Sequence, residues 1–535
     1  MPEDTPDPAP ASRARFTGWR LWAMRLVLAV VAPLLFAGAL ELGLRVCGFG
    51  YATTFFIPTA DGSGWTTNPR FCAQLFPPDD HLRPWPARLP ARKPAGTLRI
   101  FILGESAAMG TPDPSFGFAR ILEVMLARAH PGRRFEVVNA AVRGVNSHVL
   151  LPIARECAEH EPDLFLIYMG NNEATGLYAP EPGALDLTSH LHLLRLITRA
   201  KMTRTAQLLG SPGRCVEAEQ TMAFFRARQL AATDPRRLAI LDNFRANLRD
   251  ICAAARGAKV LVSTVAVNLR DCPPLGSTPE ADAHFRAGRY ALARDGDTLP
   301  FRADSRINDI IREEAAHREG AGIFLADPAQ ALGEPGDDLF YDHVHLRFAG
   351  DYAVAQMLLP RVAAALALGP GGAIPSRDEC AAALAFNEWD ALDMDTAIAQ
   401  LTAGPPFLDQ LDHAARQARA ERSIRERTSR FGAEDIRRAT EVCRAAVEKN
   451  PADWQLQFIL GRMLLAFQKP AEAVRPLEAA VRMVPDYPPT RLLLAECLLK
   501  TRRPNQATGQ LNEVLRIDPH SAAAHAALER AKTPR

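Results

Sequence analysis

Short apolar segments alternate with helical patterns between residues 99 and 366, and this alternation restricts the possible folds more than any other feature of the chain. Strands are predicted at Arg99–Leu103, Glu136–Asn139, Leu164–Met169, Val260–Val267 and Ile323–Ala326. Helices are predicted at Phe116–Ala129, Ser147–His160, Arg237–Ala255 and Phe348–Leu366. Strands that alternate with helices form a parallel sheet covered on both faces, so an α/β domain is expected over residues 96–370.

The first predicted strand ends abruptly at Gly104-Glu105-Ser106. In open α/β sheets ligands bind at the carboxyl ends of the strands, and the start of the next helix adds unpaired N–H groups that stabilise negative charge. Ser106 is therefore a candidate nucleophile. The same position also suits a serine that only caps a helix.

Three further loops at or near predicted strand ends carry polar residues beside or near glycine. They are Asn139–Asn146, which contains Gly144, Gly170-Asn171-Asn172-Glu173, and Asp342-His343-Val344-His345. Each loop alone is typical of an ordinary turn. Together they bring an amide, an imidazole and a carboxylate to the sheet edge that carries the serine hydroxyl, which are the groups that acyl transfer requires.

In their order along the chain these four blocks resemble those of the SGNH family, also called GDSL-type hydrolases. The matching positions are Ser106 in G-E-S, Gly144, Asn172 in G-N-N-E, and Asp342 with His345 in D-x-x-H. The resemblance covers roughly half of the chain and implies a flavodoxin-like three-layer α/β/α fold and ester hydrolysis. Glu105 and Glu173 stand where the family usually has Asp, and both replacements keep the carboxylate.

The resemblance implies a role for each matching residue. Ser106 would be the nucleophile, His345 its general base, and Asp342 the carboxylate that fixes the tautomer of the histidine. The N–H groups of Ser106 and Gly144 and the side-chain amide of Asn172 would form the oxyanion hole. His343 is the rival base, because alternate residues of an extended segment face the same side.

No metal ion or organic cofactor is expected. The nine cysteines are scattered without a C-x-x-C pair, and one or two disulfides are compatible with an exported protein. The net charge is only +2 and there is no long basic run, so nucleic acid is not an expected partner. An ester or an acylated carbohydrate is the expected substrate.

The N-terminal 46 residues predict a membrane segment. An uncharged run covers Leu26–Leu40 and follows four arginines, Arg13, Arg15, Arg20 and Arg25. Residues 1–20 would be a cytoplasmic tail, residues 21–46 a retained signal anchor, and the rest of the chain would lie outside, periplasmic or extracellular. Ala37-Gly38-Ala39 also resembles a signal-peptide cleavage site, and a buried helix of a soluble protein is a third interpretation.

Residues 47–95 are predicted to be a stiff extended linker that spaces the body of the protein from the membrane. The prediction rests on the prolines between residues 73 and 96: Pro77, Pro78, Pro84, Pro86, Pro90 and Pro94. Neither a helix nor a central strand tolerates this density of proline. A second unusual segment, residues 174–236, is a long insertion near a strand end, where insertions often set specificity.

The C-terminal region repeats with a period of 34 residues. The period is set by Pro451, Pro485 and Pro519 and again by Ala439, Ala473 and Ala507. Residues 431–535 therefore resemble tetratricopeptide repeats, which are all-α and usually present a concave face to protein partners. The alternative is that the array only packs on the hydrolase domain. Residues 371–430 would be a helical connector or a degenerate repeat.

Taken together, these features predict a membrane-anchored serine esterase outside the cytoplasm, with an acyl-enzyme formed on Ser106. An O-acyltransferase for envelope glycans would use the same residues and differ only in the acceptor. A non-catalytic scaffold, in which the repeats carry the function, is the hypothesis from another class.

Overall fold

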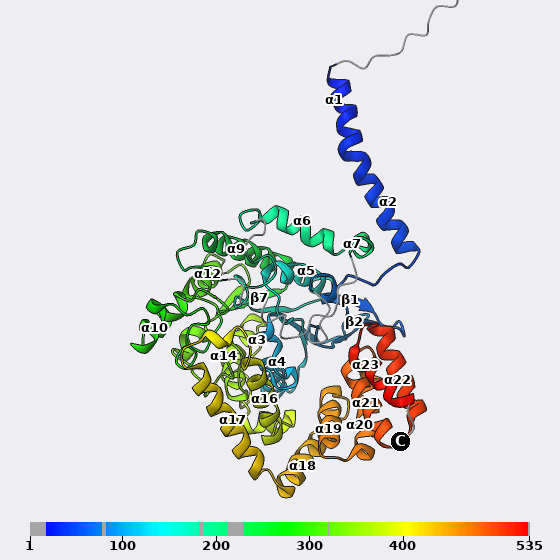
Figure 1. The fold of residues 1–535 in the computed structure, drawn as a ribbon, viewed down its shortest axis with the longest axis vertical. Coiled ribbons are helices and arrows are strands. Elements are labelled where there is room, and N and C mark those ends of the chain that lie inside the picture. Colours follow the sequence, from blue (N-terminus) through cyan, green and yellow to red (C-terminus); the bar gives the residue numbers. More distant parts are fainter. Residues whose placement is uncertain (1–17, 77–81, 181–185, 211–228, 319, 533–535) are drawn as a thin grey trace, which may run out of the picture. The chain divides into compact units, whose positions relative to one another are not determined.

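The computed structural model describes residues 18–76, 82–180, 186–210, 229–318 and 320–532 (Figure 1). The expectations for Arg13 and Arg15, for Pro77 and Pro78, and for Cys215 lie outside these residues, as does the side chain of Arg20. The chain divides into two compact units. One unit comprises residues 1–51 and 202–212, and the other comprises residues 52–201 and 213–535.

The smaller unit contains one long apolar helix with a short helix packed against it. The long helix runs without a break through α1 (Trp19–Leu26), the π-helical turn η1 (Val27–Val31) and α2 (Ala32–Val46). An 18-residue window within the 26 residues Leu21–Val46 has a mean hydropathy of 2.2, so this helix is long and apolar enough to cross a membrane. Glu41 accepts hydrogen bonds from the N–H groups of Arg204 and Thr205 at the start of α7 (Arg204–Leu209).

The larger unit is built on a five-stranded parallel sheet with the order β5-β4-β6-β7-β8. The strands are β4 (Thr97–Gly104), β5 (Arg134–Asn139), β6 (Leu164–Tyr168), β7 (Lys259–Ser263) and β8 (Ile323–Ala326). In chain order this is 2-1-3-4-5, the flavodoxin-like order. The predicted strand positions are confirmed to within a few residues, except that β7 ends at Ser263 rather than at Val267.

Helices cover both faces of this sheet, as the buried apolar strands require. One layer holds α4 (Phe118–Ala129) and α14 (Phe348–Ala365), and the other holds α5 (Ser147–Cys157), α9 (Arg236–Ala254) and α12 (Ser305–Ala316) (Figure 1). The expected three-layer α/β/α fold is therefore confirmed. The remaining helices of this part are α3 (Ser106–Met109), η3 (Pro114–Phe116), α6 (Leu191–Lys201), α10 (Pro279–Arg286), α11 (Tyr290–Asp295) and α13 (Pro328–Leu332).

The predicted extended linker over residues 47–95 is wrong for residues 52–76 and 82–95. They fold into the larger unit around a three-stranded antiparallel sheet with the order β1-β2-β3. These strands are β1 (Phe56–Pro58), β2 (Gly64–Thr67) and β3 (Arg88–Pro90), and the turn η2 (Phe71–Gln74) follows β2. The prolines stand at strand ends or between strands, where no ladder hydrogen bond is lost.

This small sheet packs on the main domain through aromatic rings. Phe55 and Phe71 are completely buried, and the ring of Phe56 contacts those of Phe101 on β4 and His160, with centroids 6.2 and 4.6 Å away. The carboxylate of Glu156 on α5 accepts the N–H groups of Phe55 and Phe56, at 2.7 and 3.1 Å. Burial raises the pKa of Glu156 to about 7, although these hydrogen bonds oppose the rise.

Among the described residues the C-terminal region contains helices and no strand, and successive helices of the repeats contact one another. Its connector contains α15 (Arg377–Leu384), α16 (Glu388–Thr402), η4 (Phe407–Asp409) and α17 (His413–Arg430). The repeats contain α18 (Ala433–Lys449), α19 (Trp454–Ala466), α20 (Pro470–Met483), α21 (Pro488–Lys500), α22 (Pro504–Ile517) and α23 (Ala522–Lys532). Gly461 allows α19 to approach α20 closely, because a Cβ there would lie 2.4 Å from Cγ of Leu477.

If the small sheet is part of the folded core, Phe56→Ala should lower the free energy of unfolding by about 3 kcal/mol, because it leaves a cavity against Phe101. Denaturant unfolding of the variant measures this loss. The matched control is Ile57→Ala, at the next position of the strand, where the side chain is only half-buried. Equal losses in the two variants, or none in Phe56→Ala, would contradict the packing described here.

Candidate active site

Ser106 stands at the carboxyl end of the strand that lies between β5 and β6. It is the first residue of α3, and the residue before it, Glu105, keeps an extended backbone. The hydroxyl of Ser106 is half-buried. Ser106 is thus not the helix cap that the sequence allowed as an alternative, since Glu105 occupies that position and makes no capping hydrogen bond.

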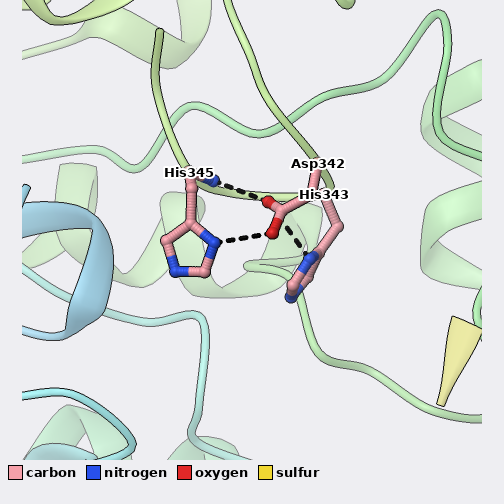
Figure 2. Close-up of side chains that lie close together, drawn as sticks. All are labelled: Asp342, His343 and His345. Carbon is pink, nitrogen blue, oxygen red and sulfur yellow. Dashed lines mark hydrogen bonds and ion pairs between the residues drawn. The ribbon is translucent and has the colours of Figure 1, made fainter. Parts of the chain in front are cut away.

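The structure brings Ser106, His345 and Asp342 together in one hydrogen-bonded chain. Nε2 of His345 lies 2.9 Å from Oγ of Ser106. Nδ1 of His345 lies 2.6 Å from Oδ2 of Asp342, a contact that Figure 2 shows. A carboxylate can only accept, so Nδ1 carries the hydrogen and Nε2 is free to accept from the serine hydroxyl. In this arrangement the imidazole can take the proton of Ser106 without first changing its tautomer.

The carboxylate of Asp342 is held in place by its own loop. Its other oxygen, Oδ1, accepts the N–H groups of Val344 and His345, both at 2.9 Å (Figure 2 draws the bond to His345). Burial alone would raise the pKa of Asp342, but the two neighbouring histidines and these hydrogen bonds hold the pKa well below its usual value. Asp342 is therefore an anion at neutral pH.

Asn268, in the segment that follows β7, supports this loop. Its side-chain amide donates to the carbonyl oxygen of Asp342 at 3.0 Å, and its own N–H donates to the carbonyl oxygen of His343 at 3.0 Å. From the sequence, the segment that begins at Asn268, after the fourth predicted strand, was expected only to form a wall of the pocket, and Asn268 was given no role toward the histidine loop. Its place directly after an apolar run at a strand end, like that of the four recognised blocks, was the signal that could have found it.

Gly144 and Asn172 follow the two strands that flank β4, so their loops approach Ser106 from both sides. The amide of Asn172 donates to the carbonyl oxygen of Val145, next to Gly144, at 2.9 Å, and this hydrogen bond joins the two loops. Gly144 has a φ of +69°, a backbone conformation that favours glycine. Within the described part of the chain, the N–H groups of Ser106 and Gly144 donate to no protein acceptor.

Glu105 anchors the Asn172 loop to the strand that carries the serine. Its buried carboxylate accepts the N–H groups of Gly170, Asn171 and Asn172, at 3.2, 2.8 and 3.3 Å. Burial and the nearby charge of Glu173 raise the pKa of Glu105 well above its usual value, against the effect of these three hydrogen bonds. A glutamate at this position, longer than the aspartate usual in the SGNH family, therefore still accepts hydrogen bonds from backbone N–H groups at the strand end.

Glu173 ties the same loop to the start of α5. Its carboxylate accepts the N–H and the hydroxyl of Ser147, at 2.8 and 2.7 Å, and the hydroxyl in turn accepts from Asn247 on α9. Burial raises the pKa of Glu173. Two buried carboxyl groups therefore support the Asn172 loop from either end.

His343, the rival base, points away from Ser106. Its ring lies between Phe301 and Phe407, with centroids 4.8 and 5.4 Å away, and its Nδ1 is 3.3 Å from Oδ1 of Asp342. Burial lowers the pKa of His343, so its ring is neutral. The geometry therefore places His345, and not His343, beside the serine.

One group of potential metal ligands occurs among the described residues, and it is the loop just discussed. Donor atoms of Asp342, His343 and His345 lie within 4.8 Å of one another (Figure 2). The 2.6 Å contact between His345 and Asp342 is a hydrogen-bond distance that leaves no room for an ion between these two atoms. Their arrangement fits a hydrogen-bonded pair better than a metal centre.

The strand order and the side chains at its carboxyl edge define an α/β domain of the flavodoxin-like class with a serine, a histidine and an aspartate in contact. At the other end of the chain, family models for the tetratricopeptide repeat match residues 428–488 and 464–531. The predicted repeats at the C-terminus are therefore confirmed. A comparison with curated proteins finds no significant match.

Several solved structures are similar to parts of the chain at low sequence identity. An acetyl xylan esterase, AlAXEase, is 16% identical and covers 50% of this chain and 100% of its own, with a TM-score of 0.27. A putative GDSL-like lipase from Parabacteroides merdae is 12% identical and covers 51% and 96%, with a TM-score of 0.29. The second tetratricopeptide-repeat domain of human RPAP3, solved with an HSP70 peptide, is 21% identical and covers 21% and 92%, with a TM-score of 0.18.

Because Glu173 keeps its proton to a higher pH in the folded than in the unfolded chain, it contributes stability that is lost as pH rises. The loss begins near the ordinary value of 4.5 and continues toward neutral pH. In Glu173→Gln the free energy of unfolding should therefore decrease less steeply between pH 5 and 8, with a slope smaller by up to about 1.4 kcal/mol per pH unit than in the wild type. Glu334→Gln, at an exposed position, serves as the control. An unchanged slope in Glu173→Gln would contradict this role.

Proposed function

We propose that this protein is a membrane-anchored serine esterase that hydrolyses an ester through an acyl-enzyme on Ser106. The observation that carries the proposal is the contact chain from Oγ of Ser106 to Nε2 of His345 and from Nδ1 to Asp342, at 2.9 and 2.6 Å. A serine hydroxyl is a weak nucleophile at its own pKa, and an adjacent oriented base removes that limit.

In the first half-reaction Oγ of Ser106 attacks the acyl carbon while His345 takes the hydroxyl proton. Asp342 stabilises the imidazolium that forms, because its carboxylate stays ionised and faces Nδ1. His345 then gives the proton to the leaving alcohol oxygen, and the acyl group remains on Ser106. In the second half-reaction His345 activates water in the same way, and the acid is released.

The negative charge of the tetrahedral intermediate needs fixed donors. The N–H groups of Ser106 and Gly144 and the second N–H of the Asn172 amide are proposed for this role. The first two make no hydrogen bond to protein within the described residues, and the Asn172 amide is oriented by its bond to Val145. Removing one such donor typically costs about 10²–10³ in rate.

The proposed location of the domain follows from the N-terminal helix. The helix Leu21–Val46 would be a retained anchor, with the arginines before it on the cytoplasmic side and the catalytic domain outside, periplasmic or extracellular. An ester or an acylated carbohydrate of the cell envelope would then be the substrate. The repeats are of a kind that suggests contact with protein, and they supply a partner surface in this proposal.

The test of the proposed mechanism is turnover of a short-chain aryl ester by the full-length protein in detergent. Ser106→Ala and His345→Ala should each lower kcat/KM by about 10³ or more, because the nucleophile or its base is lost. His343→Phe should stay within about tenfold of the wild type, since a phenyl ring fits between Phe301 and Phe407. Equal losses in His343→Phe and His345→Ala would reject the assignment of the base.

The identity of the acceptor separates hydrolysis from transfer. With an aryl acetate as the acyl donor and a glycan with free hydroxyl groups as a possible acceptor, we expect the acyl group to be released as free acid, with no acylated sugar. Mass spectrometry of the products measures the ratio of free acid to acylated sugar. Acylated sugar as the main product would replace the esterase by the O-acyltransferase alternative, which uses the same three residues.

The scaffold hypothesis predicts, in contrast to the esterase proposal, that Ser106 is not needed for function. A Ser106→Ala protein that retains every cellular phenotype would support a non-catalytic role for the whole chain. Loss of ester turnover together with the phenotype in the same variant would exclude it.

A further inference from the structure

One face of the repeat array is already occupied by other parts of the same chain. Trp454, Phe458 and Arg462 are spaced by four residues on α19 and so share one face of that helix. The ring of Trp454 contacts that of Trp85, with centroids 5.3 Å apart, and the ring of Tyr487, before α21, lies 5.6 Å from both. Trp85 belongs to the segment that precedes β3, far from the repeats in sequence.

Arg462 is the charged centre of this face. Its guanidinium lies over the rings of Trp389 and Phe458, at 5.4 and 5.9 Å, which holds the side chain in one position. It forms ion pairs with Asp113, at 2.8 Å, and with Asp390 on α16, at 3.3 Å. Only 22% of the Arg462 side chain is exposed, and that of Asp390 is completely buried, so these pairs are shielded from water.

Asp113 lies in the loop that follows the nucleophile helix. The N–H groups of Gly110 and Thr111 donate to the carbonyl oxygen of Ser106, at 3.1 and 3.0 Å, and the Asp113 carboxylate caps η3 by accepting from Ser115. The ion pair of Arg462 is therefore connected to the backbone of Ser106 through the short loop that contains Asp113 and through the hydrogen bonds of Gly110 and Thr111.

The second loop of the site is reached by two further contacts. Arg143, next to Gly144, donates to the carbonyl oxygen of Pro112 at 2.9 Å. The side chain of Leu82 lies against Gly144, because a Cβ built on Gly144 would be 3.5 Å from Cδ2 of Leu82. The neighbouring Arg83 forms an ion pair with Asp518, after α22, at 2.5 Å. Both loops that border the serine are thus in contact with segments that the repeats hold.

We propose that the partner of the α19 face is the chain's own catalytic domain, and that Arg462 is a positioning residue for the loop behind Ser106. This inference deepens the proposed function, because it assigns the repeats a role in the same site. The alternative occupant of this face, a separate protein, would have to displace Trp85 and break the pair between Arg462 and Asp113.

The charges around Arg462 give the proposal a pH signature. The titratable groups around it are Asp113, Asp390, Asp393, Cys443 and Tyr487, and two further charged groups, Arg83 and Arg143, act on Tyr487. Burial raises the pKa of Cys443 and of Tyr487, so both stay neutral up to pH 9. Burial also raises the pKa of Asp390 to about 8 although Arg462 opposes the rise. Without the arginine, the cost of burying Asp390 increases as pH rises, because the opposing charge that favours its ionised form is gone.

The experiment compares Arg462→Met, Arg462→Lys and the control Arg437→Met in the full-length protein. Arg437 is an exposed arginine on α18 that also pairs with two carboxylates, Glu434 and Glu441. Hydrogen exchange of the amides between residues 110 and 117 should be at least about tenfold faster in Arg462→Met and unchanged in Arg437→Met. The exchange rate of Arg462→Lys should lie between those of the other two variants, because lysine keeps the charge but lacks the guanidinium group that pairs with two carboxylates at once.

Ester turnover supplies the second readout. We expect kcat/KM of Arg462→Met to fall by about 10- to 100-fold at pH 7, mainly in kcat, with a loss that grows between pH 6 and 9. Adding Asp113→Asn should recover part of the loss, because one uncompensated charge is removed while the cap of η3 is kept. A loss that is independent of pH and equal in Arg437→Met would overturn the positioning role.

The two proposals can fail separately. If the wild type turns over no ester, the proposed function fails, and the exchange of residues 110–117 still decides whether the repeats hold this loop. If the wild type is active and Arg462→Met exchanges and reacts like the wild type, the positioning role fails and the esterase stands.

Discussion

The geometry of the site depends on the hydrogen bonds that the buried carboxyl group of Glu105 accepts. It accepts three consecutive backbone N–H groups from the loop after β6, and it stands directly before Ser106. Ser106 and the loop that carries Asn172 are therefore fixed to each other through one side chain. In the proposed mechanism, donors held in this way need little reorganisation when charge develops on the substrate.

The sheet could be predicted from the sequence because its strands are continuous apolar runs, as parallel strands buried on both faces must be. The same reliance on continuous apolar runs made the predicted strand at β7 longer than the observed one. Residues 264–267 continue the apolar run, but the neighbouring strand β8 has only four residues and pairs no further than Ser263. The N–H of Val265 then bonds the side chain of Asn308 instead. The end of a strand is thus decided by its neighbour and not by its own residues.

Proline density led to the wrong prediction for residues 52–76 and 82–95, because it excludes helices and central strands but not a sheet of very short strands. The buried Phe55, Phe71 and Trp85 carried the missing information. At the site, the D-x-x-H spacing was sufficient for Asp342 and His345, since both groups lie in one turn. The contacts of Arg462 join segments far apart in sequence, and no local pattern encodes them, whereas Asn268 at least follows an apolar run like the other site residues.

Glu41 gives the N-terminal helix a natural boundary. Its carboxylate receives the N–H groups of Arg204 and Thr205, so a hydrated loop must sit at this level of the helix. As a membrane span, the helix is then left with Leu21–Leu40 for the hydrocarbon. Twenty residues at a rise of 1.5 Å measure about 30 Å, the thickness of a typical bilayer core, so in the proposed membrane-anchored arrangement the contact with α7 would set how deep the helix lies.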